Sequence, residues 1–130
     1  MNTLTRTEVV DPITTEVIRN KLEGIANEME LTLLRSSFSP IVKEGLDTSA
    51  SLFTVNGETL AQACAIPVHL ATLIPALKTM VEKYPIATMR DGDAFILNDP
   101  YCGGTHLPDI AIMTPVFHGG RVIALTATMT

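Results

Sequence analysis

A twelve-residue segment, 98–109, most limits how this chain can fold, because prolines and glycines interrupt it too often for a helix or strand to pass through. It reads Asn-Asp-Pro-Tyr-Cys-Gly-Gly-Thr-His-Leu-Pro-Asp. Its glycines permit a tight turn or a close approach to a ligand, and its prolines fix the direction of the chain. The segment also holds two carboxylates, one imidazole and one thiol: Asp99, Asp109, His106 and Cys102. A shaped loop of this kind, held on a rigid scaffold, often carries function.

The first regular element is predicted to be a long helix. Asp11-Pro12 marks its start, since Asp is a good N-cap and Pro is favoured at the first helical position. The helix should end before Ser39-Pro40, because a residue that precedes proline avoids helical geometry. Residues 43–49 are expected to form a polar linker. Apolar residues recur at helical spacing after the cap: Val17, Ile18, Leu22, Ile25, Ala26, Met29, Leu33 and Leu34.

A second helix is expected over about Leu70–Lys83, with either a kink at Pro75 or a start near Ile74. The uncharged stretch 61–77 is too short for a membrane span and is interrupted by prolines. We interpret it as a buried strand followed by a buried helix.

The remaining segments predict strands. Asn56-Gly57 between two short β-compatible runs, 51–55 and 58–63, is a strong hairpin signal. Further strands are expected at 94–97, at 110–117 with Pro115 at an edge or a bulge, and at 121–129 after a turn at His118-Gly119-Gly120. The order is a helix, a hairpin, a second helix and then at least three strands. It favours an α+β fold with a mostly antiparallel sheet.

Composition narrows the function. The 130 residues carry a net charge of −5 with no basic run, which argues against a nucleic-acid partner. The polar start has no secretory signal, and two cysteines, Cys64 and Cys102, are too few for a disulfide framework, so a cytoplasmic location is expected. Because the apolar strand pattern continues to Thr130, we expect residues 1–130 to be part of a larger domain.

His106 and Asp109 are the first candidates for chemistry. In a loop rich in proline and glycine, side chains three residues apart can converge on one ion, and imidazole with carboxylate suits Zn, Mn or Fe. The alternative is a turn in which Asp109 accepts backbone N–H bonds and His106 caps the loop. The other histidines and nearby carboxylates that could join them are His69, His118, Asp99, Asp47 and Glu44.

Other polar residues have two interpretations. Cys102 has room beside Gly103-Gly104 and a histidine four positions on, as a nucleophile would need, but a buried inert thiol is the more common case. His69 lies between Val68 and Leu70 and fits a core histidine better than a ligand. Glu44 and Asp47 either belong to a solvated loop or line a site.

Taken together, the motifs resemble the N-terminal part of the hydantoinase B/oxoprolinase family. The resemblance runs over nearly the whole chain in family order, and the final loop is its most specific piece. The matching pieces are Asp11-Pro12-Ile13, Glu16–Asn20, Arg35–Pro40, Lys43-Glu44 with Asp47 and Ser49, Ile66–Leu70, Gly92-Asp93, Asn98–Tyr101 and Gly103–Asp109.

The resemblance implies a subunit that works with a hydantoinase A-type partner, which binds ATP. The pair opens a small cyclic amide such as 5-oxoproline, a hydantoin or another lactam. His106 and Asp109 match metal-ligand positions, while Asn98 and Asp99 support the loop, with Asp99 counted among the catalytic residues. Family members are usually several times longer, so the remainder of the B-type subunit is expected to complete the metal site, and the 130 residues alone are expected to be inactive. Two alternatives remain: a subunit of an ATP-dependent ketone carboxylase, and a non-catalytic assembly module.

Overall fold

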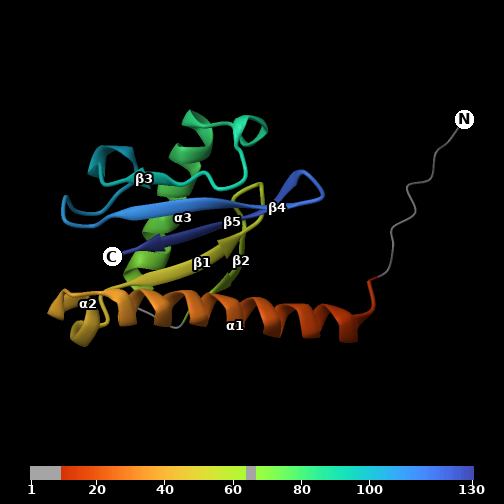
Figure 1. The fold of residues 1–130 in the computed structure, drawn as a ribbon, viewed down its shortest axis with the longest axis horizontal. Helices are drawn as coiled ribbons and strands as arrows, with labels where there is room; N and C mark the ends of the chain where they lie inside the picture. The colour runs from red at the N-terminus through yellow and green to blue at the C-terminus, as the bar shows by residue number, and fades with distance from the viewer. Residues whose placement is uncertain (1–9, 64–66) are drawn as a thin grey trace, which may run out of the picture.

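The structure, a computed structural model, describes residues 10–63 and 67–130, with the backbone alone for residues 67–70. Over these residues one antiparallel sheet is formed, with the strand order β2-β1-β5-β4-β3 (Figure 1). Its strands are β1 (Ser49–Phe53), β2 (Thr59–Gln62), β3 (Phe95–Leu97), β4 (Ala111–His118) and β5 (Arg121–Met129). The predicted α+β class with an antiparallel sheet is confirmed.

The long first helix, α1 (Pro12–Ser36), begins where the sequence predicts, because the Asp11 carboxylate accepts a hydrogen bond from the Thr14 backbone N–H at 3.0 Å. The helix lies against β1 and β2 on one face of the sheet (Figure 1). Ala26 is fully buried there, with Leu22 and Met29 packed beside it. The apolar stripe of α1 is wider than the surface that β1 and β2 offer, so part of the stripe stays uncovered by these strands. Val17, Ile18 and Ile25 are exposed.

The helix α3 (Pro67–Lys83) crosses the opposite face of the sheet (Figure 1). Leu73 and Leu77 of α3 pack against Phe53, Met113 and Leu125 in the main hydrophobic core. Pro75 lies inside the helix, so the predicted start near Ile74 is wrong, while a kink at Pro75 stays a prediction.

Residues 43–49 are not a linker, and that prediction is wrong. A short helix, α2 (Pro40–Gly45), takes up its first part, and β1 already begins at Ser49. Ser39 at the N-cap and Pro40 at the first helical position form a helix-start signal, although the same pair also fits the end of the preceding helix. The uncharged stretch 61–77 is predicted to begin with a buried strand, and this prediction is also wrong. The strand there, β2, lies at the edge of the sheet, and Ala61 is its buried residue.

The prediction for Pro115 is confirmed. The neighbouring strand β3 pairs with β4 only as far as Met113. At Pro115 the strand β4 therefore has β5 on one side and, within the residues that the structure describes, no partner strand on the other. A missing N–H therefore costs the sheet no hydrogen bond. A bulge follows between Val116 and Phe117.

Half of one sheet face has no helix over it in the described part of the chain. This open face lies on the side away from α3 and consists of Ile96, Ile112, Thr114, Val116, Thr126 and Thr128. Ile96 is 69% exposed, and the Thr114 and Thr126 hydroxyls bond to each other at 2.6 Å. Of the helices in residues 10–63 and 67–130, none has both the length and the apolar sequence that crossing a bilayer requires.

Candidate functional site

The segment 98–109 forms a loop at one end of the sheet. After β3 it forms a short 3-10 helix, η2 (Pro100–Cys102), and then runs to the start of β4. Ile110 and Thr130 exchange backbone hydrogen bonds of 2.8 and 3.2 Å, which hold the loop beside the end of β5. In Figure 1 this teal loop and the C-terminus lie at the same end of the sheet.

Two glycines allow the close backbone contacts that hold the loop. Gly103 has a φ of +97°, and a Cβ placed on it would lie 2.9 Å from backbone atoms of Pro75 and Ala76 in α3. A Cβ on Gly104 would lie 2.9 Å from the Asp99 carbonyl oxygen. The first glycine therefore sets how closely the loop lies on α3, and the second sets how tightly the loop turns.

The loop brings His106 and Asp109 together. His106 Nδ1 lies 3.0 Å from Asp109 Oδ2, and the Thr105 hydroxyl donates to the same oxygen. The imidazole is 74% exposed and the carboxylate only 12%. Both hydrogen bonds that the described residues make to this carboxylate come from side chains, which differs from the alternative in which Asp109 accepts backbone N–H bonds. The pair thus presents an accessible imidazole beside a carboxylate whose orientation is fixed.

The spacing of the pair fits two ligands of one divalent ion. Donor atoms that each lie about 2.1 Å from an octahedral ion, at a right angle to one another, are about 3.0 Å apart, which is also the usual length of an N–H···O hydrogen bond. The observed separation of Nδ1 and Oδ2 is 3.0 Å. Within the described residues no group of three or more His, Cys, Asp or Glu side chains is placed to hold an ion. In the described residues, His106 and Asp109 are therefore a pair of candidate ligands without a third such side chain beside them.

Asp99 shapes the loop through its own neighbours. One carboxylate oxygen accepts a hydrogen bond from the Tyr101 backbone N–H at 2.9 Å, and the other accepts one from the Cys102 thiol at 3.4 Å. That hydrogen bond raises the pKa of the Cys102 thiol, with smaller contributions from desolvation and from the negative charge of Asp99. A raised pKa leaves less thiolate, which disfavours Cys102 as a nucleophile.

Replacing Asp99 by Asn is expected to make Cys102 more reactive. Loss of the carboxylate removes the main cause of the raised thiol pKa, so the pH–rate profile for alkylation of Cys102 by iodoacetamide should move to lower pH. The profile is measured in a Cys64→Ser background, so that one thiol reports. Glu58→Gln, which removes an exposed carboxylate in the β1–β2 turn, serves as the control. An unshifted profile in Asp99→Asn would contradict the assigned interaction.

The other candidate residues do not form a group of three or more ligating side chains with the pair in the described residues. Glu44 is exposed in α2, and Asp47 lies half-buried just before β1. His118 ends β4, about 23 Å along the strand from the loop at the usual rise per residue. Cys64 and the side chain of His69 lie outside the described residues.

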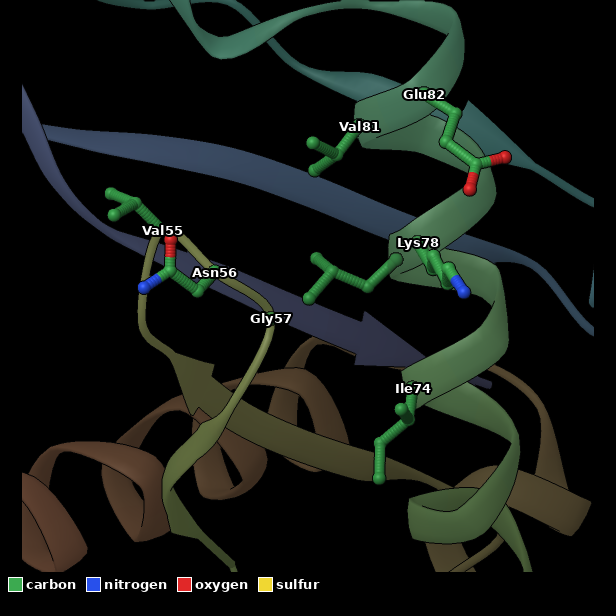
Figure 2. Close-up of a pocket in the computed structure, with 8 residues that line it drawn as sticks. Val55, Asn56, Gly57, Ile74, Lys78, Val81 and Glu82 are labelled. Atoms are coloured by element: carbon green, nitrogen blue, oxygen red, sulfur yellow. The ribbon is translucent and has the colours of Figure 1, made fainter.

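A pocket of about 460 Å³ lies elsewhere, between the β1–β2 turn and α3. Figure 2 shows the Val81 side chain pointing across it towards the turn, while the charged ends of Lys78 and Glu82 point away. Gly103 meets α3 at Pro75 and Ala76, on a different side of the helix from Ile74, Lys78 and Val81. The pocket is therefore separate from the loop, and no motif in the sequence points to it.

Thr105 is a residue of the site that sequence reasoning missed. Its hydroxyl reaches Asp109, and the four-residue spacing between them was the available signal. A threonine is neither a preferred metal ligand nor a titrating group at neutral pH. For this reason the histidine and the carboxylates of the loop stand out in the sequence and Thr105 does not.

Comparison with known sequences places nearly the whole chain in one family. A family model described as hydantoinase B/oxoprolinase matches residues 11–130. A 5-oxoprolinase from Dictyostelium discoideum is 37% identical over 124 residues, which is 95% of this chain and 10% of that protein. Caprolactamase subunit beta from Pseudomonas jessenii is 38% identical over 90% of this chain and 20% of its own length.

Two solved structures share the fold. ATP-dependent caprolactamase from Pseudomonas jessenii superposes with a TM-score of 0.81 and 34% identity, over 93% of this chain and 21% of the other. Nucleotide-free acetone carboxylase gives a TM-score of 0.82 and 26% identity, over 93% of this chain and 16% of the other. The chain thus spans between a tenth and about a fifth of the proteins it matches.

Proposed function

The chain belongs to the hydantoinase B/oxoprolinase family, and from this premise we propose that it is the N-terminal part of an ATP-dependent, metal-dependent hydrolase that opens cyclic amides. The observation that carries the proposal is the 3.0 Å pair of His106 Nδ1 and Asp109 Oδ2, in which the imidazole is mostly exposed. The substrate class is supported by the names of two relatives, a 5-oxoprolinase and a caprolactamase, which both refer to a lactam ring. Hydantoins are the third candidate ring.

The residues of the loop have distinct proposed roles. His106 and Asp109 bind a divalent ion, with Mn, Zn and Fe as candidates. Asn98 and Asp99 hold the loop, Asp99 through its bonds to Tyr101 and Cys102. A bound ion would polarise the amide carbonyl or lower the pKa of a water molecule. ATP is assigned to a hydantoinase A-type partner, since this sequence contains no Walker pattern.

The surface supports the proposal that further polypeptide packs on this chain. The open face has no helix over it in the described residues, and Ile96 on it is 69% exposed, so this face is one candidate for the contact. Beside it a hollow of about 440 Å³ separates Thr128 from Ile25 and Met29 of α1.

The proposed occupants of this surface are the remainder of the B-type subunit and the A-type partner. Caprolactamase subunit beta is by its name part of a complex, and this chain corresponds to 20% of that subunit. The cytoplasm remains the proposed compartment, because two cysteines do not build a disulfide framework.

A second candidate is a subunit of an ATP-dependent ketone carboxylase. The fold shared with acetone carboxylase, at a TM-score of 0.82, favours it specifically. A non-catalytic assembly module remains the third candidate. It predicts stable association with a partner and no bound metal.

The complete assembly that contains this chain decides between them. Purified assembly is supplied with ATP and Mn²⁺, and 5-oxoproline, a hydantoin, caprolactam and acetone are tested separately, with and without bicarbonate. We expect ring opening of a cyclic amide that needs ATP but not bicarbonate. Turnover of acetone that requires bicarbonate would identify the assembly as a ketone carboxylase instead. An assembly that binds no metal and turns over none of the four would support the assembly module.

A further inference from the structure

Thr105 lies between the proposed metal-binding pair and the core of the protein. Its hydroxyl donates to Asp109 Oδ2, the oxygen that also faces His106 Nδ1. Its other side meets Met129, whose sulfur lies 4.0 Å from the Thr105 hydroxyl oxygen. Met129 is buried and also accepts a hydrogen bond from the Thr72 hydroxyl of α3 at 3.5 Å.

The contacts of Thr105 restrict the rotation of the Asp109 side chain. The Asp109 side chain has two χ angles, and its contact with His106 alone would join it to an imidazole that is 74% exposed. The Thr105 hydroxyl adds a second bond that starts on the packed side, against Met129 of β5. The Thr105 hydroxyl and the His106 ring nitrogen thus meet the same carboxylate oxygen, and the Thr105 bond limits how the carboxylate can turn relative to the imidazole.

We propose that Thr105 is a positioning residue for metal binding, which holds Asp109 in the orientation that an ion shared with His106 requires. This inference rests on the proposed function, because it assumes that the pair binds a metal. Groups that hold ligands in place typically contribute 10- to 100-fold to metal affinity. The hydroxyl is the active part of Thr105, so serine should replace it and valine should not.

The test is a Mn²⁺ titration of the ¹⁵N-labelled chain followed by paramagnetic line broadening, which detects an ion even at a weak two-ligand site. Wild type, Thr105→Val and Thr105→Ser are compared. Thr114→Val is the matched control, because it removes a half-buried threonine hydroxyl from the open face, away from the loop. The ¹⁵N spectrum of each variant verifies its fold. If valine disrupts packing at Met129, Thr105→Ala removes the same hydroxyl without the added methyl group.

In the wild type, broadening should be selective for the amides of residues 103–109. Thr105→Val and Thr105→Ala should weaken the apparent affinity about tenfold, whereas Thr105→Ser and Thr114→Val should stay within about twofold. Selective broadening that survives unchanged in both Thr105→Val and Thr105→Ala would overturn the role of Thr105 and leave the metal site standing. A wild type without selective broadening at the loop would overturn both this inference and the metal site on which it rests.

Discussion

Replacing Gly103 by Ala is expected to destabilise the protein by about 3 kcal/mol and to displace the loop that carries His106 and Asp109. Two effects add. At a φ of +97° an L side chain is strained, and the new Cβ would lie 2.9 Å from backbone atoms of Pro75 and Ala76, which cannot rotate away. The loop must therefore lift from α3, or α3 must shift. Chemical unfolding measures the loss of stability, and the ¹⁵N spectrum shows which amides move.

Two other glycines separate the contributions. Gly92 has a φ of +88° with nothing near the position that a Cβ would take, so Gly92→Ala reports the backbone strain alone. Gly104 has no positive φ in the strained range, but its Cβ would meet the Asp99 carbonyl oxygen at 2.9 Å, so Gly104→Ala reports close contact alone. We expect Gly103→Ala to cost more than Gly92→Ala. Equal losses would mean that the contact with α3 contributes nothing.

Replacing His106 by Ala is expected to lower the metal affinity of the complete assembly by at least about 100-fold, the upper end of what even supporting residues contribute. The reason is that His106 is one of the two proposed ligands in the described residues. Stability should change little, because the imidazole is mostly exposed. Dialysis against buffered Mn²⁺ or Zn²⁺, followed by elemental analysis, measures the affinity.

The matched control for that experiment is His118→Ala. His118 is also exposed, but it lies at the other end of β4, beside the Gly119-Gly120 turn. The variant should keep wild-type affinity. A loss of metal in both variants would indicate a general effect of removing histidines, and retention in His106→Ala would place the ion elsewhere.

Most of the fold could be predicted from local chemistry. The Asp11-Pro12 cap, the Asn56-Gly57 turn and the apolar strands after residue 110 each depend on neighbours in the sequence, and these elements appear as expected. The start of α3 and the helix α2 could not be predicted in this way, because a single proline at Pro75 or Pro40 is consistent with more than one helical position. Tertiary contacts choose between such positions.

The candidate site was predictable to a smaller extent. The meeting of His106 and Asp109 could be inferred from their spacing and from the resemblance, because both lie in one short loop. The contact of Gly103 with α3, and the placement of Thr105 against Met129, join segments far apart in the chain. Neither a motif nor a periodic pattern records such contacts.

The central claim, that His106 and Asp109 are two ligands of one metal ion, is tested most directly by anomalous X-ray diffraction from crystals of the complete assembly grown with Mn²⁺. We expect a manganese peak within about 2.3 Å of both a ring nitrogen of His106 and a carboxylate oxygen of Asp109, with the remaining ligands supplied by other polypeptide. A fully occupied manganese peak elsewhere in the assembly, with none at this pair, would contradict it.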